Sequence, residues 1–260
     1  MLNITTGQIE AWVALYLWPF LRIGACVMVA PVFGAAFVPA RMRIVLAAAI
    51  TLLVAPLLPP QPLVTPLSAA GLIVTVQQLI IGVAIGFVLQ VVFDSLAMGG
   101  QLLANSMGLS FAFNVDPLRG ASTPVLGQLY MLLVTLTFLA LNGHLTVLEI
   151  LVDGFRTLPV GQDGLGADGL WQIGLWGGQI FRGSLIVALP GLTALLIVNL
   201  AFGVVSRAAP TLNLFAIGFP VTLVCGLVIV LLGLPAVQTS FIGLMRESFM
   251  LLADLMRMRG

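Results

Sequence analysis

The sequence contains no lysine, one histidine and very little charge of either sign. Only 7% of its residues are charged, whereas an average globular protein has about 25%. So few charges cannot cover a water-exposed surface, which excludes an ordinary cytosolic enzyme. The net charge of +1 also provides no basic surface for nucleic acid. Hydrophobic residues make up 60% of the chain, so the composition indicates an integral membrane protein.

The same shortages exclude several catalytic motifs. Without lysine there is no Walker-type G-x-x-x-x-G-K-[ST] loop, and a single histidine excludes the H-E-x-x-H zinc motif. Cys26 and Cys225 lie in apolar runs, where cysteine is a small packing residue. Residues 164–169 spell G-x-G-x-x-G but lie in a loop between apolar helices, without the strand that a dinucleotide site requires. We predict no enzyme activity, no cofactor and no metal site.

Long stretches without charge predict an all-α membrane protein. A helix that crosses the hydrocarbon core needs about 20 apolar residues. Six apolar helices are predicted, at residues 9–30, 41–58, 71–94, 125–152, 180–205 and 212–234. Prolines in or beside them indicate kinks: Pro19, Pro31, Pro190 and Pro220. A seventh stretch, 236–259, places apolar residues at helical spacing with charges between them, which predicts a C-terminal amphipathic helix.

Two long connections separate these stretches, at residues 95–124 and 153–179. The second is rich in Asp and Gly, as expected of a polar loop, and loops of this length are often functional. Arginines divide almost evenly between the alternate loops, so the positive-inside rule assigns no orientation. Either the chain has a different number of spans, or its helices do not form a simple up-and-down bundle.

Arg22 lies inside the first apolar stretch and has the highest insertion cost in the chain. A guanidinium near the middle of a span costs about 2.5–3.5 kcal/mol on insertion scales, so it should face protein or water. One interpretation is a structural ion pair, with Asp94 or Glu149 as the acid. The other is a contact between subunits or a place in a pore wall.

Gly82 and Gly86 form a G-x-x-x-G pair in the third apolar stretch. This spacing puts both glycines on one helix face and predicts close approach of another backbone. The neighbouring Gln77 and Gln78 support a helix contact, because amides in lipid seek hydrogen-bond partners.

His144 follows Asn142-Gly143. A proton-carrying role is open, since the unperturbed pKa of histidine is about 6.5. A structural role in capping a helix break is favoured, because only Glu149 offers a second ionisable group nearby in the sequence.

The segment 106–124 (SMGLSFAFNVDPLRGASTP) combines apolar Phe111 and Phe113 with Asp116-Pro117. Irregular backbone at membrane depth persists only where it is buried in protein or lines a water-filled cavity. The segment is therefore either a solvent loop that touches the headgroups or a plug that seals a path to ions.

A series of short motifs follows in order along nearly the whole chain: Arg22-x-Gly24, Pro31-Val32-Phe33, Pro39, Arg43, Gln78, Gly82, Gly86-Phe87, Gly100-Gln101, Gly108, Asp116-Pro117, Asn142-Gly143-His144, Arg207-Ala208-Ala209-Pro210, Asn213-Leu214-Phe215 and Gly218-Phe219-Pro220. Together they resemble the FliR family of flagellar type III export-gate proteins, which includes the equivalent gate subunit of virulence injectisomes. Each motif is weak alone, and their order and spacing carry the resemblance.

The resemblance implies a FliP-like portion at residues 1–179 and a FliQ-like helical hairpin with the amphipathic helix at residues 180–260. It implies a hetero-oligomeric gate with FliP-like and FliQ-like subunits, further partners FlhB and FlhA, and a place in the bacterial inner membrane at the flagellar basal body. It also maps the family's plug onto the loop near 106–124, with Phe111, Phe113, Asp116 and Pro117 as plug candidates and Met107 beside them.

The function expected is gating of a channel through which unfolded flagellar proteins are exported. Two alternatives stay open at this point. Kinked helices and intramembrane ionisable residues also suit a secondary transporter for a small solute. A scaffold subunit that closes a ring without gating is the other.

Overall fold

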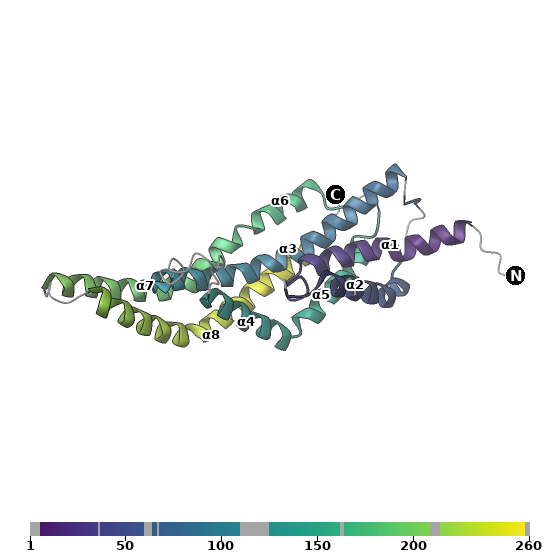
Figure 1. Cartoon of the computed structure of the whole chain (residues 1–260). Coiled ribbons are helices and arrows are strands. Elements are labelled where there is room, and N and C mark those ends of the chain that lie inside the picture. Colours follow the sequence, from purple (N-terminus) through teal and green to yellow (C-terminus); the bar gives the residue numbers. More distant parts are fainter. Residues whose placement is uncertain are drawn as a thin grey trace. The chain divides into compact units, whose positions relative to one another are not determined.

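The computed structural model describes residues 6–35, 37–59, 64–66, 68–109, 125–161, 164–208 and 214–257. Every regular element among these residues is helical, so the predicted all-α class is confirmed (Figure 1). The elements are α1 (Thr6–Val29), α2 (Ala40–Val54), the 3₁₀ turn η1 (Ala55–Leu57), α3 (Ala69–Ser106), α4 (Val125–Ala140), α5 (Gly143–Thr157), α6 (Ala167–Trp176), α7 (Gln179–Ala208) and α8 (Leu214–Arg257).

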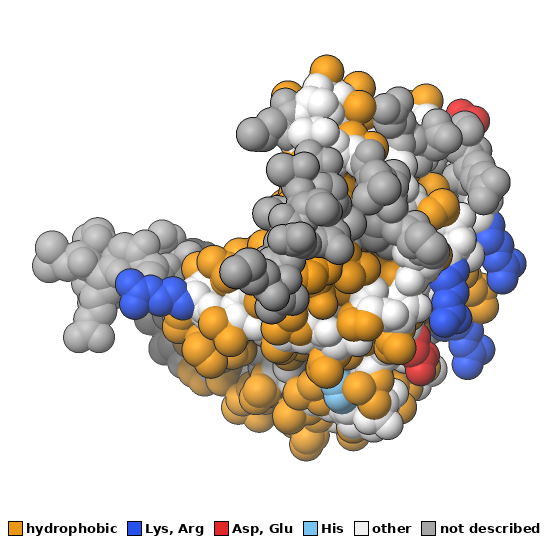
Figure 2. Space-filling model, turned by 90° about the vertical axis from the view of Figure 1, so that its right-hand side faces the viewer, with side chains coloured by type: hydrophobic (Ala, Val, Ile, Leu, Met, Phe, Trp, Pro, Cys, Tyr) orange, Lys and Arg blue, Asp and Glu red, His pale blue; other side chains and the backbone are white. Residues whose placement is uncertain are grey.

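Five helical stretches among the described residues are long and apolar enough to cross a membrane: Trp12–Val29, Ala40–Leu57, Ala69–Ser106, Ala167–Ala208 and Gly218–Arg257. The pair α4 and α5 makes a sixth if it counts as one bent span. Hydrophobic side chains cover most of the described surface visible in Figure 2, and charged ones gather toward its margins. Such a surface suits lipid or protein neighbours, as expected of a membrane protein.

Two predicted helix ends were wrong because charge and proline did not end a helix. The third helix was predicted to stop at Asp94, but α3 continues to Ser106, so only the later part of the predicted 95–124 connection lies outside it. The helices predicted at 212–234 and 236–259 are one continuous helix, α8, with Pro235 inside it. A proline removes one backbone donor, which leaves the Leu231 carbonyl without its usual helical partner, and α8 nevertheless continues past Pro235 to Arg257.

Two further predicted boundaries were wrong because helices end or begin inside the predicted segments. The single helix predicted at 125–152 is broken into α4 and α5, which are bent by 65°. The break lies at Asn142, whose φ of 56° is left-handed, a conformation that asparagine tolerates better than most residues. The predicted polar loop at 153–179 contains the end of α5 and the short helix α6.

The chain forms two compact units that each combine several separate segments. Unit 1 comprises residues 1–91, 139–177 and 246–260, and unit 2 comprises residues 92–138 and 178–245. The apolar cluster of unit 1 joins α1, α2, α3 and α5 with the segment after α5, through Ala14, Trp18, Ile23, Val27, Ala47, Val74, Phe155 and Val160.

Within unit 1, α1 packs closely against the first half of α3. A Cβ added at Gly82 would collide with the Arg22 carbonyl oxygen and lie 2.8 Å from the Ala25 Cβ. A Cβ at Gly86 would lie 2.8 Å from the Val29 Cβ. The two helices run parallel here, since later positions of α3 meet later positions of α1. The absence of side chains at these two glycines lets the backbones approach, as in small-xxx-small helix pairs.

The turn from α1 to α2 is held by Arg43. Its side chain donates hydrogen bonds to the carbonyls of Val38 at 3.1 Å and Ala35 at 2.8 Å. Val32 has a φ of 70° in this turn, an unfavourable backbone conformation for a β-branched residue. The contacts of Arg43 thus help to fix a strained connection.

Unit 2 is built around the second half of α3. The Phe93 ring makes edge-on contacts with Phe138 of α4, at a centroid distance of 5.5 Å, and with Phe241 of α8, at 5.4 Å. A Cβ at Gly183 of α7 would lie 2.7 Å from the Ser95 hydroxyl oxygen, and one at Gly191 would lie 2.6 Å from Leu103. Helices α4, α7 and α8 therefore all pack on this one helix.

We expect Gly82→Ala to destabilise the protein by about 1–3 kcal/mol, because the added methyl group must push the α1 backbone away. The matched control is Gly243→Ala, where no atom lies within 4 Å of the added Cβ. Removal of a helical glycine alone should stabilise by up to about 1 kcal/mol. Thermal unfolding in detergent, followed by tryptophan fluorescence, measures both. Equal effects of the two substitutions would contradict the close contact.

Candidate functional site

Arg22 is completely buried in unit 1, and its guanidinium joins three helices. Nε donates to Oε1 of Gln78 on α3 at 2.7 Å. The two terminal nitrogens donate to the carbonyl oxygens of Gly154 and Leu158 at 3.0 Å each. The guanidinium also lies 4.2 Å from the centre of the Phe155 ring. A charge from α1 thus holds α3 and the end of α5.

The Arg22 guanidinium acts as a cap for the carboxyl end of α5. Leu158 is the C-cap residue of α5, and its N–H already donates to the Gly154 carbonyl. Carbonyls at a helix end lack partners within the helix and carry the negative end of its dipole. A buried cation at this end therefore meets two acceptors and a favourable field, and the Phe155 ring adds a cation–π contact.

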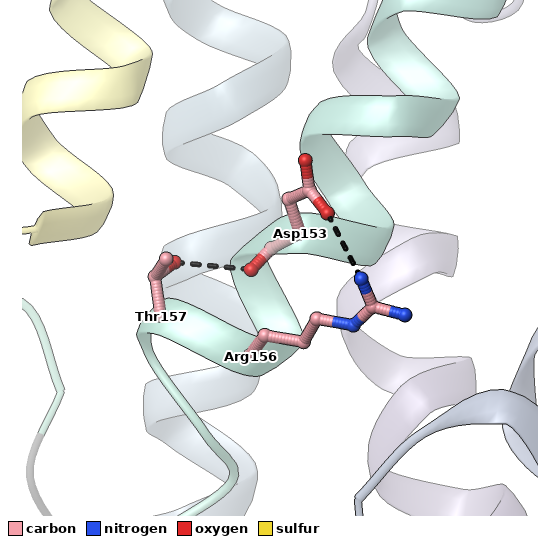
Figure 3. A network of polar contacts seen from close by, with 3 residues as sticks. All are labelled: Asp153, Arg156 and Thr157. Atoms are coloured by element: carbon pink, nitrogen blue, oxygen red, sulfur yellow. Dashed lines mark hydrogen bonds and ion pairs between the residues drawn. The ribbon is translucent and has the colours of Figure 1, made fainter.

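The last turn of α5 also has a basic residue of its own, which lies on the surface. Arg156 pairs with Asp153 at 3.7 Å, and the Thr157 hydroxyl donates to the Asp153 carbonyl at 3.1 Å (Figure 3). The paired side chains are 64% and 71% exposed, and surface pairs of this kind contribute little. The buried cap comes from α1, far away in the sequence.

The acids considered for Arg22, Asp94 and Glu149, are not among its hydrogen-bond partners, which are an amide and two backbone carbonyls. Asp94 lies partly exposed on α3, and Glu149 is exposed on α5. Sequence reasoning selected Arg22 and Gln78 but missed Gly154, Phe155 and Leu158. No residue type marks a carbonyl at a helix end as an acceptor, so the sequence carried no direct signal for them.

Gln77 is next to Gln78 in the sequence, but its side chain lies against Gly164. A Cβ added at Gly164 would collide with the Gln77 side-chain amide, so Gly164 provides the space that this amide occupies. Gly164 begins the formal G-x-G-x-x-G, which follows α5 and runs into the first turn of α6. This setting does not match the strand, turn and helix of a dinucleotide site.

His144 lies in the first turn of α5, directly after the break at Asn142. Its Nδ1 atom is buried and has no hydrogen-bond partner among the described residues. Asn142 is the N-cap residue, and its side chain makes no capping hydrogen bond. Arg207 is exposed in the last turn of α7, where a cation faces the negative end of the helix dipole.

The predicted plug segment begins at a well-defined anchor in unit 2. Met107 is buried, and Gly226 of α8 leaves the space for it: a Cβ at Gly226 would lie 2.5–2.7 Å from the Met107 side chain. Gly108 follows with a φ of 80°, a left-handed conformation typical of the residue that ends a helix. Phe111, Phe113, Asp116 and Pro117 lie outside the described residues.

The far end of the same segment returns to α3. A Cβ at Gly100 would lie 2.7 Å from the carbonyl oxygen of Leu126, in the first turn of α4. Met107 and Gly100 are only about two helical turns apart on α3. The described residues that flank segment 110–124 therefore both lie near the last turns of α3, with Met107 against Gly226 of α8 and Leu126 against Gly100. The sequence offered no signal for Gly226, which lies in a different apolar stretch from Met107.

These features define a helical membrane protein with no cluster of three or more metal-ligating side chains among its described residues. The family described as bacterial export proteins, family 1, matches residues 13–248, and the chain belongs to this family.

The chain is also similar to curated proteins named flagellar biosynthetic protein FliR. It is 40% identical to the one from Escherichia coli strain K12 over 255 residues, which cover 98% of this chain and 97% of that protein. It is 38% identical to the one from Pectobacterium carotovorum, with 98% of each chain covered. The protein from Buchnera aphidicola of Schizaphis graminum is 31% identical, with 88% of each covered.

Arg22→Met should lower the free energy of unfolding by about 3 kcal/mol, because Gln78 and two carbonyls lose a charged donor while remaining buried. Arg22→Lys should be intermediate, since an ammonium cannot reproduce the planar fork of a guanidinium. Arg207→Met, an exposed arginine near a helix end, is the control, and chemical denaturation in detergent is the measurement. A similarly small effect at both arginines would rule out the capping role.

Proposed function

We propose that this chain is a subunit of the flagellar protein export gate, located in the bacterial inner membrane at the flagellar basal body. The end-to-end match to flagellar biosynthetic proteins carries this proposal, with 40% identity over 255 residues to the Escherichia coli protein. The apolar helices support a membrane location. The subunit contributes to a channel for unfolded flagellar proteins, and we propose no enzymatic role for it.

The partners we propose are FliP-like and FliQ-like subunits, with FlhB and FlhA beside them. The proposed FliP-like portion is 1–179, and the FliQ-like hairpin with its amphipathic extension is 180–260. The antiparallel pair α7 and α8 supports this division, because α7 begins at Gln179 and the Thr222 hydroxyl of α8 donates to Asn199 of α7 at 3.2 Å. In the last part of α8, apolar side chains at helical spacing are buried (Phe241, Leu244, Met245, Leu252 and Met256), and Phe249 between them is half-buried.

The gating mechanism we propose uses the loop between α3 and α4. Its two ends stay fixed, one through Met107 at the end of α3 against Gly226 of α8, and the other through the first turn of α4 against Gly100 of α3. Between these anchors the loop blocks the lumen at rest and moves aside for a substrate chain. A fixed base is required for such a seal, because a plug with free ends has no defined resting position.

Deletion of residues 110–120 should raise the ion leakage of the membrane while the subunit still assembles. The deletion removes the proposed plug and retains both described anchors. Ion conductance is measured in cells or vesicles and normalised to the assembled complex. A deletion variant as ion-tight as the parent would remove the basis for a plug and favour a scaffold that does not gate.

Gly226→Val should also raise ion leakage, because the added side chain occupies the space of Met107 and displaces the loop base. Gly233→Val is the control on the same helix. It lies two turns further along α8, and a Cβ there meets no atom within 4 Å. Leakage at Gly233→Val equal to that at Gly226→Val would mean that the Met107 anchor does not seat the loop.

A further inference from the structure

An open apolar groove lies between α1 and α2 in unit 1. Its volume is about 310 Å³, and its walls are Tyr16, Leu17 and Phe20 of α1 with Ala48, Thr51 and Leu52 of α2. The Thr51 hydroxyl already donates to the Ala47 carbonyl of its own helix at 2.7 Å. The groove therefore offers α2 surface that suits hydrocarbon.

Helix α2 is exposed over most of its surface. The stretch Ala40–Leu57 is long and apolar enough to cross a membrane, and only 17% of it is buried inside the protein. Large aliphatic side chains on it are exposed, among them Val45, Leu52 and Leu53. An exposed apolar surface at this length fits acyl chains.

Arg41 lies on the same face of α2 as the groove. It is seven residues before Ala48 and eleven before Leu52, so the three positions fall within about 40° of arc at 3.6 residues per turn. Along the helix axis, Ala48 and Leu52 are about 10 Å and 16 Å from Arg41. Side chains on a helix tilt toward its N-terminus, which carries the guanidinium further away from the groove.

The start of α2 is a site that favours an anion. Arg41 is exposed and has no hydrogen bond or ion pair with the residues that the structure describes. Its neighbour Arg43 is instead bound to the carbonyls of Val38 and Ala35. The N-cap residue of α2 is Pro39, and no side chain caps the helix. An unpaired guanidinium thus adds to the positive end of the helix dipole.

The spacing of the cation and the groove matches one leaflet of a bilayer. Half of a hydrocarbon core about 30 Å thick is about 15 Å. With Arg41 at the level of the headgroups, Ala48 and Leu52 lie at the depth of the acyl chains of the same leaflet. A phospholipid supplies an anion and an acyl chain at this spacing in one molecule. An apolar helix in the groove supplies no anion for Arg41.

We propose that unit 1 binds an anionic phospholipid, with the phosphate at Arg41 and the start of α2 and one acyl chain in the groove between α1 and α2. Basic residues beside membrane helices recognise anionic headgroups in this way. The inference goes beyond the proposed export function and does not depend on it, since it requires only that the chain lies in a membrane.

Thermal unfolding of the full chain in neutral detergent, followed by tryptophan fluorescence, tests the headgroup contact. Phosphatidylglycerol, phosphatidylcholine with the same acyl chains, or inorganic phosphate is added in increasing amounts. We expect phosphatidylglycerol to raise the unfolding temperature more than phosphatidylcholine, and inorganic phosphate to leave it unchanged. Equal gains from the two lipids would overturn the proposal, because Arg41 would then be an anchor without headgroup preference. An equal gain from inorganic phosphate would also overturn it, because the site would take a free anion.

Arg41→Gln should weaken the apparent affinity for phosphatidylglycerol about fivefold, since one arginine beside an anionic headgroup contributes about that factor. Arg207→Gln, at an exposed arginine of unit 2, is the control and should keep the affinity of the parent. An unchanged affinity in Arg41→Gln, or an equal loss in the control, would place the headgroup elsewhere.

The acyl chain is tested by filling the groove. Ala48→Phe should remove the advantage of long-chain over short-chain phosphatidylglycerol, whereas Ala49→Phe, at the exposed neighbouring position, should retain it. If both variants retain the advantage, the chain does not lie in the groove. If Ala48→Phe does not fold, the parent decides: equal gains from long-chain and short-chain lipid would overturn the groove as the binding site.

Discussion

Close backbone approach along α3 is the constraint on which both units depend. Apolar surface provides little net drive for association between helices in lipid, so contacts must come from tight packing and hydrogen bonds. The first half of α3 meets this requirement with Gly82 and Gly86 against α1, and the second half with Gly100 against α4. A single larger side chain at any of these positions would force a neighbouring helix outward. The same helix can therefore position the core of each unit and the base of the loop.

The buried guanidinium of Arg22 is a second constraint that the apolar interior imposes on the structure. A guanidinium costs free energy in an apolar interior unless all of its donors find acceptors. Arg22 finds an amide on α3 and two carbonyls at the end of α5. The end of α5 carries the negative end of the helix dipole, where a cation is favourable, and its own Arg156 lies on the surface with Asp153. The buried guanidinium and the carbonyls at the end of α5 thus satisfy each other in one contact.

The all-α class and several contact residues could be predicted because they depend on local composition. Charge-free runs indicated the helices, and Gln78, Gly82 and Gly86 stood out as polar or small residues in an apolar stretch. The predicted helix ends failed at Asp94 and Pro235, because a partly exposed carboxylate and a proline can both lie inside a long helix.

The pairings were beyond single-sequence reasoning for a different physical reason. Arg22 bonds to carbonyls that every residue possesses, and Met107 fits against a glycine on another helix. In both contacts the partner is a backbone carbonyl or a glycine, so no partner side chain marks the contact in the sequence. Such contacts follow from the arrangement of the helices and become visible only once that arrangement is known.

In the gating mechanism that we propose, the contact between Met107 and Gly226 of α8 stays closed while the loop moves. A disulfide between Met107→Cys and Gly226→Cys, made in a chain with Cys26 and Cys225 replaced by serine, tests this claim most directly. A Cβ at Gly226 would lie 2.5 Å from the Met107 Cγ, so two cysteines at these positions are within reach of a disulfide, which joins Cβ atoms about 3.5–4.5 Å apart. With the bond closed, we expect the gate to remain ion-tight and export to continue. A complete loss of export that a reductant reverses would contradict the account, because the anchor itself would then have to open.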